Sequence, residues 1–441
     1  MKVVIVGGGF AGLRLARKLN NKPGFEILLV EKFNYHQFQP LFYQVATAAL
    51  DASNISFPLR KAFHNSKNVK IRMAELKEVL PQQNRIVTDV EEINYDVLVL
   101  AMGADTNFFG NQQIASHAFP MKSTVEAIQL RHRFIQNFED ALTAKTDDEL
   151  QRLMNVVIVG GGPTGVELSG ALSEMKKYVL PKDYPELDFK RMNIFLLEGG
   201  DRTLGSMSEQ SSKDAGHYLK KLGVTVMTDT IVKDYDGQNV MLADDKTIPS
   251  NMVIWAAGIK GNVPEGIDKS LIVRGNRIKV DRHSKLNGFD NVYVLGDLAY
   301  METPKYPTGH PQVASVAIAQ AEVLADNLRR IERKAKDFFE FEYFDKGSMA
   351  TVGRNLAVVD IPKPKLHLRG LIAWLIWMGL HLFLILGVKN RLFVFFNWVY
   401  SYITYDQSLR LIFKEFYKPK NQAENTSKQA TATPQIEKQL A

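Results

Sequence analysis

Short apolar runs separated by turn residues recur along this chain and set its pattern of predicted elements. VVIV occurs at both 3–6 and 156–159, and each copy leads into a glycine-rich turn and a segment with helical spacing. The runs at 97–100, 253–255 and 292–295 have the same apolar character. Such runs, bounded by turn residues, are typical of buried parallel strands. The pattern therefore predicts an α/β fold in which helices connect the strands of parallel sheets.

The two glycine-rich turns share one spacing, G-x-G-x-x-G. In this motif the first glycine makes a tight turn, the second lets the backbone approach a pyrophosphate, and the third lets the helix pack closely on the strand. The helix N-terminus then favours the anion, and an acid at the end of the next strand accepts from ribose hydroxyls. The residues are Gly7, Gly9, Gly12 and Glu31 in the first copy, and Gly160, Gly162, Gly165 and Glu198 in the second. Two complete copies favour two bound dinucleotides over glycine-rich turns without a ligand.

The repeat extends beyond the glycines. Each copy ends in an apolar strand followed by a small-residue turn, with Ala101 and Gly103 in the first and Ala257 and Gly258 in the second. This indicates an internal duplication. A later strand ends in Gly296–Asp297, and a helical pattern covers 310–334. We expect two Rossmann-like domains, the first formed by 1–110 and 264–335 and the second, 111–263, inserted in it. The crossing strands would lie near 110–125 and 259–280.

Composition narrows the chemistry. The 441 residues are 45% hydrophobic, contain no cysteine and carry a formal charge of +7. The absence of cysteine excludes a redox disulfide, an iron–sulfur cluster and a persulfide carrier. No run of basic and aromatic residues suggests nucleic acid, and no metal-ligand spacing is present. Because the first strand begins at residue 2, we expect no signal peptide. We therefore expect the main folded part of the protein to be cytosolic. The polar segment 414–441 is expected to be disordered.

Several longer runs carry a more specific resemblance. They are YHQFQPLFYQVATAAL at 35–50, GGGPTGVELSGAL, LGDLA and the apolar RGLIAWLIWMGLHLFLILGVKNRLFVFFNW. Together with the paired glycine motifs they resemble type II NADH:quinone oxidoreductases, which are two-dinucleotide flavoproteins of the glutathione reductase type. The resemblance covers nearly the whole chain except the tail. It implies electron transfer from NADH through FAD to membrane quinone without proton pumping.

The resemblance also implies roles for individual residues. FAD would be held at the first site and NADH at the second, with Glu198 favouring NADH because a carboxylate repels the 2′-phosphate of NADPH. Arg202 would slightly weaken this exclusion. The residues implied for FAD are Gly7, Gly9, Phe10, Ala11, Gly12, Glu31, Lys32, Leu76, Ala101, Gly103, Gly296, Asp297, Ala314 and Ser315. Those implied for NADH are Gly160, Gly162, Pro163, Thr164, Gly165, Glu198, Ala257 and Gly258.

Two residues are candidates for the catalytic step. Glu167 would lie near the contact between nicotinamide and flavin, where it could position the cofactors or relay a proton, and Gln44 could face the flavin ring. The alternative for Glu167 is an ordinary glutamate favoured by the helix dipole, and for Asp297 it is a helix N-cap. His36 and His310 are expected to be structural hydrogen-bonding residues.

The chain departs from the family at one motif. A pair of glutamines four residues apart normally lines the quinone end of the helix near the flavin. Ser315 and Ala319 stand at the matching positions, with Gln312 and Gln320 nearby. This departure leaves the details of the quinone site open, but not the flavin domain.

The C-terminal region 336–413 is expected to form a membrane-anchoring domain. Within it, residues 338–365 are expected to form short strands and turns, with strands at FFEFEYF (338–344), GSMATVG (347–353) and LAVVDI (356–361). Residues 370–388 contain no Asp, Glu, Lys or Arg, and their length would allow a single transmembrane helix. Basic residues flank this run on both sides, which favours helices lying in the membrane interface over a spanning helix. We expect monotopic attachment of residues 370–400 to the cytoplasmic face of the cell membrane, and the sequence leaves a homodimer open.

Three alternative functions fit parts of this sequence. A sulfide:quinone oxidoreductase shares the architecture but needs cysteines. A soluble reductase of the ferredoxin reductase type would not need residues 370–400. A non-catalytic NADH-sensing flavoprotein is the alternative from another class, and steady oxidation of NADH by a short-chain quinone would distinguish an enzyme from it.

Overall fold

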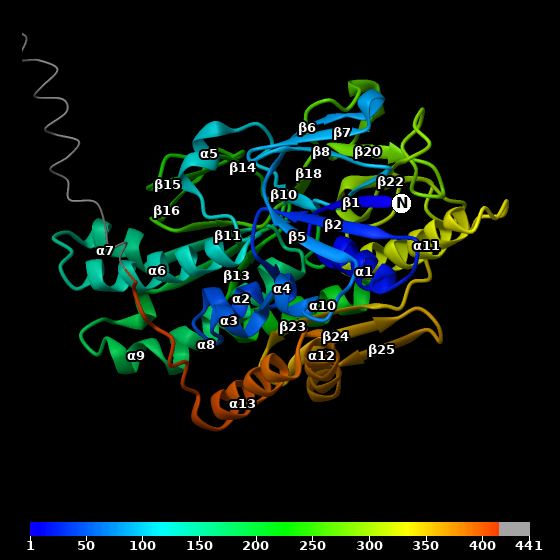
Figure 1. The fold of residues 1–441 in the computed structure, drawn as a ribbon. Coiled ribbons are helices and arrows are strands. Elements are labelled where there is room, and N and C mark those ends of the chain that lie inside the picture. The colour runs from blue at the N-terminus through cyan, green and yellow to red at the C-terminus, as the bar shows by residue number, and fades with distance from the viewer. Residues whose placement is uncertain (414–441) are drawn as a thin grey trace, which may run out of the picture. The chain divides into compact units, whose positions relative to one another are not determined.

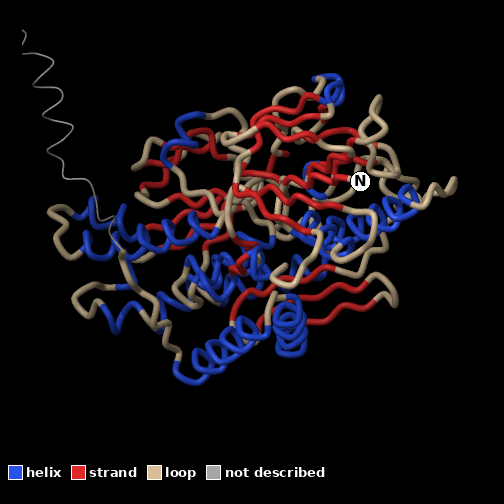
Figure 2. Tube along the Cα trace, in the orientation of Figure 1, coloured by secondary structure: helices blue, strands red, loops and turns tan. Residues whose placement is uncertain are grey.

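The computed structural model describes residues 1–413 of the chain, so the predicted disordered tail at 414–441 lies outside the described residues. Residues Met1–Arg410 form one compact unit. The two predicted parallel sheets are present in it, and helices and smaller antiparallel sheets surround them (Figures 1 and 2).

The first sheet has the strand order β21-β9-β1-β2-β5, and all its strands are parallel. Their side chains alternate between two cores. One face packs on α1 (Phe10–Leu19) and α11 (Ala314–Glu332), and the other packs on the sheet β6-β7-β8 and on β20. The strands are β1 (Lys2–Val6), β2 (Glu26–Glu31), β5 (Val69–Met73), β9 (Val97–Leu100) and β21 (Val292–Val294). Because β21 pairs with β9, the late segment completes the first sheet, as the nested arrangement requires.

The second sheet has the order β13-β12-β11-β17 and is also parallel. Helices α6 (Thr124–Ala141) and α8 (Pro163–Tyr178) cover one face, while the sheet β14-β15-β16 covers the other. The strands are β11 (Asn155–Val159), β12 (Asn193–Leu197), β13 (Thr225–Met227) and β17 (Val253–Trp255). Both parallel sheets thus carry helices on one face and a three-stranded antiparallel sheet on the other, which agrees with the internal duplication.

The second crossing strand lies within the expected range 259–280, but the first differs from the expectation. β10 (Ala104–Thr106) pairs antiparallel with β18 (Ile259–Gly261). The prediction placed the first crossing strand near 110–125, but part of that segment is the helix α5 (Gln112–His117). Asn111 caps this helix by accepting from the backbone N–H of Ile114, a local signal that the strand prediction overlooked.

The C-terminal region consists of an antiparallel sheet and two helices. The sheet contains β23 (Ser348–Gly353), β24 (Leu356–Ile361) and β25 (Leu366–Arg369). The predicted short strand at 338–344 is wrong, because these residues have no regular structure. Helices α12 (Gly370–Leu384) and α13 (Val388–Thr404) follow and appear in orange and red in Figure 1. Trp377 and Trp398 from these helices are buried in the same core cluster as α8.

The remaining elements are short. The strands are β3 (Tyr35–Gln37), β4 (Ser56–Pro58), β6 (Leu76–Leu80), β7 (Arg85–Thr88), β8 (Glu92–Asn94), β14 (Val232–Tyr235), β15 (Asn239–Leu242), β16 (Thr247–Pro249), β19 (Ile272–Val273), β20 (Arg277–Val280) and β22 (Ala299–Met301). The helices are α2 (Phe42–Ala46), α3 (Ala52–Ile55), α4 (Leu59–Ala62), α7 (Asp147–Met154), α9 (Leu180–Asp183) and α10 (Glu209–Lys221).

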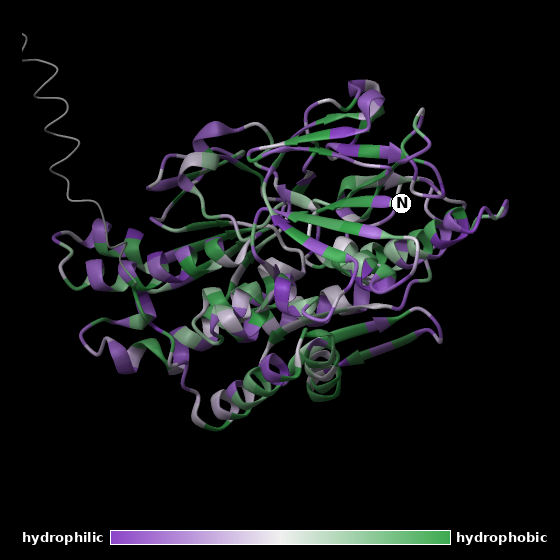
Figure 3. Cartoon of the chain, viewed as in Figure 1, coloured by the Kyte–Doolittle hydropathy of each residue, from purple (hydrophilic) through white to green (hydrophobic). Residues whose placement is uncertain are grey.

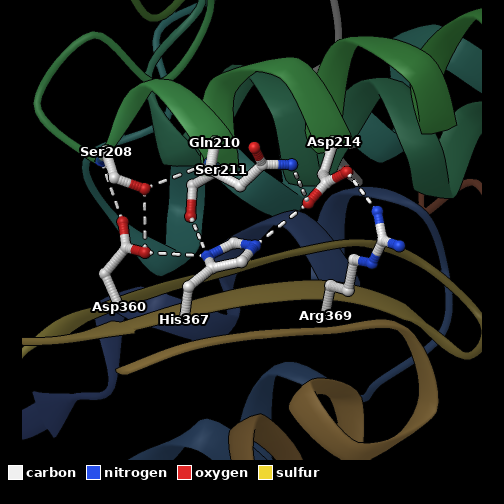
Figure 4. Close-up of polar contacts among 7 residues, drawn as sticks. All are labelled: Ser208, Gln210, Ser211, Asp214, Asp360, His367 and Arg369. Carbon is white, nitrogen blue, oxygen red and sulfur yellow. Dashed lines mark hydrogen bonds and ion pairs between the residues drawn. The ribbon is translucent and has the colours of Figure 1, made fainter. Parts of the chain in front are cut away.

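A polar cluster joins α10 to the C-terminal sheet (Figure 4). The ring of His367 on β25 lies between two carboxylates, 3.0 Å from Asp214 on α10 and 3.0 Å from Asp360 on β24. Arg369 also pairs with Asp214, at 2.9 Å. Ser208, which caps α10, donates its hydroxyl to Asp360 at 2.9 Å. Side chains from three elements thus fix the sheet against the helix.

Candidate functional site

The first glycine turn, between β1 and α1, has a different constraint at each glycine. Gly7 has a φ of +107°, and a Cβ there would overlap the carbonyl of Ala101. A Cβ on Gly12 would overlap the carbonyl of Gly7, because α1 packs closely on the turn. Gly9 has an ordinary φ of −72°, and its Cβ would meet no atom within 4 Å. The fold itself does not require glycine at residue 9, and the open space there fits an approaching phosphate.

The second turn, between β11 and α8, repeats this arrangement. Gly160 has a φ of +112°, and its Cβ would overlap the carbonyl of Ala256. A Cβ on Gly165 would overlap the carbonyl of Gly160. Gly162 has a φ of −70° and open space around the position of its Cβ. In both turns, packing leaves no room for a side chain at the first and last glycines of the motif. The middle glycine instead faces open space that a ligand could occupy.

A cavity of about 510 Å³ opens at the first turn. This volume lies in the range of about 300–1,000 Å³ that is usual for small-molecule and cofactor sites. The residues predicted for FAD that line it are Gly7, Gly9, Phe10, Ala11, Glu31, Lys32, Ala101, Gly103, Gly296, Asp297 and Ala314. Most of the predicted set is thus brought together around one space.

Three predicted residues do not line this cavity. Gly12 lies where α1 packs on the backbone of Gly7. Leu76, on β6, packs against the neighbouring hydrophobic core. The hydroxyl of Ser315 lies 2.7 Å from the hydroxyl of Tyr343 and is engaged there. The sequence interpretation also missed some lining residues, including Gln37 and Lys122. Thr164, predicted for the second nucleotide, lines the first cavity because the start of α8 faces it.

The acids at this site are held by backbone groups or buried. Burial raises the pKa of Glu31, and the N–H groups of Gly8 and Phe33, which donate to its carboxylate, oppose that shift. Burial also raises the pKa of Asp297, against the charges of Lys122 and Arg277. Asp297 is not a helix N-cap, because Leu295 occupies the cap position of its short 3₁₀ turn. Its side chain is therefore available to the cavity.

Glu198 lies beside the second glycine turn. Its carboxylate accepts from the backbone N–H of Gly161 at 2.5 Å and from that of Gly200 at 2.7 Å. Arg202 could weaken the repulsion between Glu198 and the 2′-phosphate of NADPH. It lies 3.6 Å from Glu209, however, and donates to the carbonyl of Gly205. The carboxylate is thus held beside the glycine turn while this arginine is engaged elsewhere.

Glu167 is buried within α8. It lies beyond the first turn of that helix, so the helix-dipole alternative does not describe it. Burial raises the pKa of Glu167 to about 8. The backbone N–H of Thr351 on β23 donates to it at 3.4 Å, and both this group and the Trp377 indole oppose the shift. The Trp377 N–H has no hydrogen-bond partner of standard geometry within the described residues, and Trp377 lines the same cavity as Glu167.

Gln44 on α2 accepts a hydrogen bond from a residue of α13. The Trp398 indole N–H donates to its side-chain oxygen at 2.7 Å, and its amide nitrogen donates to the Tyr43 hydroxyl at 2.8 Å. Burial raises the pKa of Tyr43 well above its usual range. A tryptophan from α13 therefore contacts Gln44, and one from α12 lies beside Glu167, although the sequence suggested only membrane contacts for these helices.

The neighbouring polar residues have structural partners. Gln312 donates to the carbonyl of Asp297 at 2.8 Å, and Gln320 accepts from the N–H of Gly296 at 2.7 Å. His36 contacts the carbonyl of Gly8 at 2.9 Å, as expected for a structural hydrogen-bonding residue. His310 differs from its prediction, because neither ring nitrogen has a hydrogen-bond partner within residues 1–413. It is buried among aromatic rings, and burial lowers its pKa to about 4.

Helices α12 and α13 expose many large apolar side chains. In Figure 3 α12 is mostly green, while α13 mixes green with pale and purple residues. The predicted apolar run 370–388 is not one helix. It breaks at 385–387, where Gly387 has a φ of +88° and lies against the ring of Phe57. α12 has 15 residues, and within the described part of the chain no helix has the length and apolar character to cross a membrane.

Comparisons with known proteins agree with this geometry. Residues 1–321 match the family model described as pyridine nucleotide-disulphide oxidoreductase, and residues 346–404 match the NDH2 C-terminal domain. The type II NADH:quinone oxidoreductase Ndh of Mycobacterium tuberculosis is 31% identical over 417 residues, which cover 91% of this chain and 88% of that protein. The chain therefore belongs to the pyridine nucleotide-disulphide oxidoreductase family and, within it, to the type II NADH:quinone oxidoreductases.

Solved structures share the fold. NDH2 from Plasmodium falciparum in complex with NADH has a TM-score of 0.84 at 20% identity, covering 94% of this chain and 99% of that one. The sulfide:quinone oxidoreductase of Aquifex aeolicus has a TM-score of 0.68 at 17% identity, covering 88% and 92%. The fold alone does not separate these two enzymes, but the absence of cysteine argues against sulfur transfer in this chain.

Proposed function

We propose that this chain oxidises NADH and reduces membrane quinone through FAD, and that Glu167 and Gln44 act between the cofactor and the quinone. When bound, FAD accepts the electron pair from NADH and passes it to the quinone. The observation that carries the proposal is the position of Glu167. It lines a small cavity together with Lys122 and Thr164, which also line the FAD cavity, and Trp377 beside it belongs to a helix with an exposed apolar face.

The two glycine turns supply the nucleotide sites. The open space at Gly9 would hold the FAD pyrophosphate, Glu31 would accept from the adenosine ribose, and Asp297 would bind the hydroxyl-bearing chain of the cofactor. The space above Gly162 fits the NADH pyrophosphate, with Glu198 at its ribose. The N-terminus of α8 favours this second pyrophosphate and at the same time brings Thr164 to the first cavity.

Glu167 is suited to hold a proton at neutral pH. With a pKa of about 8, its carboxyl is mostly protonated below that pH and can donate to a reduced acceptor. Gln44, fixed by Trp398 and Tyr43, would orient the quinone headgroup rather than exchange protons.

The test is Glu167→Gln, which keeps the shape and removes the titratable group. We expect normal FAD content and a fall in the steady-state rate with quinone of about 100-fold, the lower end of the effect of a general acid. The wild-type rate should fall as pH rises through about 8, and the variant should lose that dependence. Glu186→Gln, an exposed change of the same charge, is the control. An unchanged rate in Glu167→Gln at every pH would exclude Glu167 from the reaction.

The exposed apolar faces of α12 and α13 support attachment to a lipid surface. Phe383 is 70% exposed, Ile372 63% and Phe396 63%. Lys389 is exposed in the first turn of α13, near the ring of Phe393, where an anionic headgroup could meet it. Helices of this kind lie in the interface and prefer anionic lipid, which favours the cytoplasmic leaflet.

Flotation with vesicles containing anionic lipid tests this attachment. The double variant Phe383→Ser/Phe396→Ser should bind vesicles more weakly and keep its FAD. Phe344→Ser, a change at a residue that is 61% exposed elsewhere, should bind like the wild type. Equal binding of both variants would show that these faces are not the lipid contact. Protease treatment of a C-terminal tag from each side of the membrane tests the proposed cytoplasmic face.

A further inference from the structure

One face of helix α8 lines a second cavity, separate from that of FAD. Glu167, Ala171, Glu174 and Tyr178 follow the spacing i, i+4, i+7, i+11, which places them in one stripe along the helix. The cavity has a volume of about 120 Å³. Its other walls are formed by α2, the C-terminal sheet, α12 through Trp374, Trp377 and Met378, and the second half of α13. Two carboxyl groups of one helix therefore line a single cavity.

The size of this cavity limits what it can hold. At about 30 Å³ for each water molecule, 120 Å³ accommodates about four waters. It is below the roughly 300 Å³ at which pockets for drug-sized ligands begin. Glu167 and Glu174 are seven residues apart, so their backbones are separated by about 10.5 Å along the helix axis. This separation is too long for a direct hydrogen bond but can be bridged by a short chain of waters.

The two ends of the cavity differ in character. At the inner end, Glu167 is only 8% exposed and also lines the small cavity of about 80 Å³ next to the FAD site. At the outer end, Tyr402 and Tyr405 are 43% and 39% exposed. Glu174 is partly buried between these ends. The polar stripe thus runs from the cofactor side of α8 toward solvent.

The reaction needs one proton from solvent in each turnover. NADH gives up two electrons and one proton, while reduction of a quinone to a quinol consumes two electrons and two protons. The balance is NADH + H⁺ + quinone → NAD⁺ + quinol. The additional proton must reach a site covered by α8 and the C-terminal helices.

We propose that this cavity is a water-filled proton route from solvent to Glu167, and that Glu174 is its outer proton-carrying group. The inference rests on the proposed function of Glu167. In each turnover Glu167 would give its proton to the reduced acceptor and regain one through the waters from Glu174, which is reprotonated from solvent. Ala171 leaves the space between the two carboxyls open.

The surroundings of Glu174 suit this role. The backbone N–H of Arg354, in the turn between β23 and β24, donates to its carboxylate at 2.5 Å. Burial raises the pKa of Glu174, and the N–H and charge of Arg354 oppose the shift. The Arg354 guanidinium itself faces away, donating to the carbonyls of Ser401 and Tyr402 and covering the ring of Tyr405. The titratable and charged groups around the cavity are Glu167, Glu174 and Tyr178 of α8, Tyr43 of α2, Arg354, Tyr402 and Tyr405.

Two variants test the route in different ways. Glu174→Ala removes the outer carrier, and we expect kcat with quinone to fall about tenfold, less than for a direct acid because waters can partly replace it. Ala171→Leu fills the cavity without removing a titratable group and should give a similar loss. Both should keep the KM for quinone and the rate at which NADH reduces the bound flavin. Ala171→Ser, which leaves the space open, and the exposed Glu186→Gln are the controls.

Chemical rescue by a small acid distinguishes a proton-transfer role of Glu174 from a structural one. Added formate, a small diffusible acid, should restore much of the activity of Glu174→Ala and none of that of Ala171→Leu. Crystal structures give a readout independent of turnover: ordered waters should connect Glu167 with Glu174 in the wild type and be absent in Ala171→Leu. Normal kcat in both folded variants, or a dry cavity in the wild type, would overturn the route.

A raised KM for quinone in Ala171→Leu without a loss of kcat would instead place the acceptor in this cavity and would also overturn the route. A wild-type protein with no NADH–quinone activity would refute the proposed function itself, an outcome distinct from either of these.

Discussion

His367 is expected to hold the C-terminal sheet on α10 through a pH-dependent pair of ionic contacts. Its ring lies 3.0 Å from both Asp214 and Asp360 (Figure 4), and its side chain is 25% exposed, against 10% and 20% for the two carboxylates. His367→Ala removes both contacts and leaves two carboxylates facing the vacated space.

The magnitude follows from these contacts. A hydrogen bond to a charged group contributes about 1.5–3 kcal/mol, and partial exposure places each of the two near the lower end, so the loss is about 3 kcal/mol. The unfolding entropy of about 2.1 cal mol⁻¹ K⁻¹ per residue gives about 0.9 kcal mol⁻¹ K⁻¹ for a chain of 441 residues. The apparent Tm of His367→Ala should therefore fall by about 3 °C at a pH where the contacts are fully formed.

The pH range follows from the direction of each pKa shift. Burial alone lowers the pKa of His367, but the hydrogen bonds and charges of Asp360 and Asp214 outweigh it, so the pKa is raised above its ordinary 6.5. The stabilisation is then fully present below pH 6.5 and is lost as pH rises through the raised value. The pKa values of both aspartates are lowered from 3.8, so their contribution is present above 3.8 and is lost as pH falls through the lowered values. The contacts are strongest between these limits.

Thermal melting of wild type and His367→Ala at about pH 6 and about pH 9 tests this reasoning. The difference in Tm should be largest at the lower pH and shrink at the higher one. Arg369→Gln is the matched control. That side chain is 63% exposed, and an exposed ion pair contributes about 0–1 kcal/mol, so its Tm should change by about 1 °C or less. A His367→Ala difference that is equal at both pH values would show that the ring is not charged between the two carboxylates.

Three further outcomes are expected. Gly9→Ala should fold normally but hold FAD at least about tenfold more weakly, whereas Gly12→Ala should lower the Tm, because its Cβ meets backbone; equal Tm values would contradict the distinction between the two glycines. Glu198→Gln should narrow the preference for NADH over NADPH, measured as the ratio of kcat/KM values, since the charge that repels a 2′-phosphate is lost. Trp398→Phe should cost about 1–3 kcal/mol of stability by leaving the buried oxygen of Gln44 unpaired, measured by denaturant unfolding against Phe393→Leu, a change on the exposed face.

The features that could be predicted from the sequence are those that short segments determine by themselves. The glycine spacing, the acids at the ends of β2 and β12 and the small-residue turns after β9 and β17 all depend on local geometry that the residues alone specify. The nesting of the two domains followed from the second strand–turn–helix unit and the late Gly296–Asp297.

What the sequence did not reveal depends on contacts between distant segments. Trp377 and Trp398 belong to apolar runs, and apolar periodicity cannot distinguish a side chain that faces lipid from one that faces a buried polar group. The contact between Gln44 and Trp398 joins residues 354 positions apart. The break at Gly387 was overlooked because no charge marks it, and the apolar segment 338–344 has the composition of a strand without a partner to pair with.

The inward indoles of Trp377 and Trp398 limit how the proposed lipid-binding surface could be removed by engineering. Truncation before α12 would remove Trp398, which donates to Gln44, and Trp377, which lines the cavity of Glu167. It would also expose the core around α8. Replacing only the outward residues of both helices with polar ones would leave these contacts intact. The proposed lipid contact therefore has to be removed by redesigning the surface of these helices and not by shortening the chain.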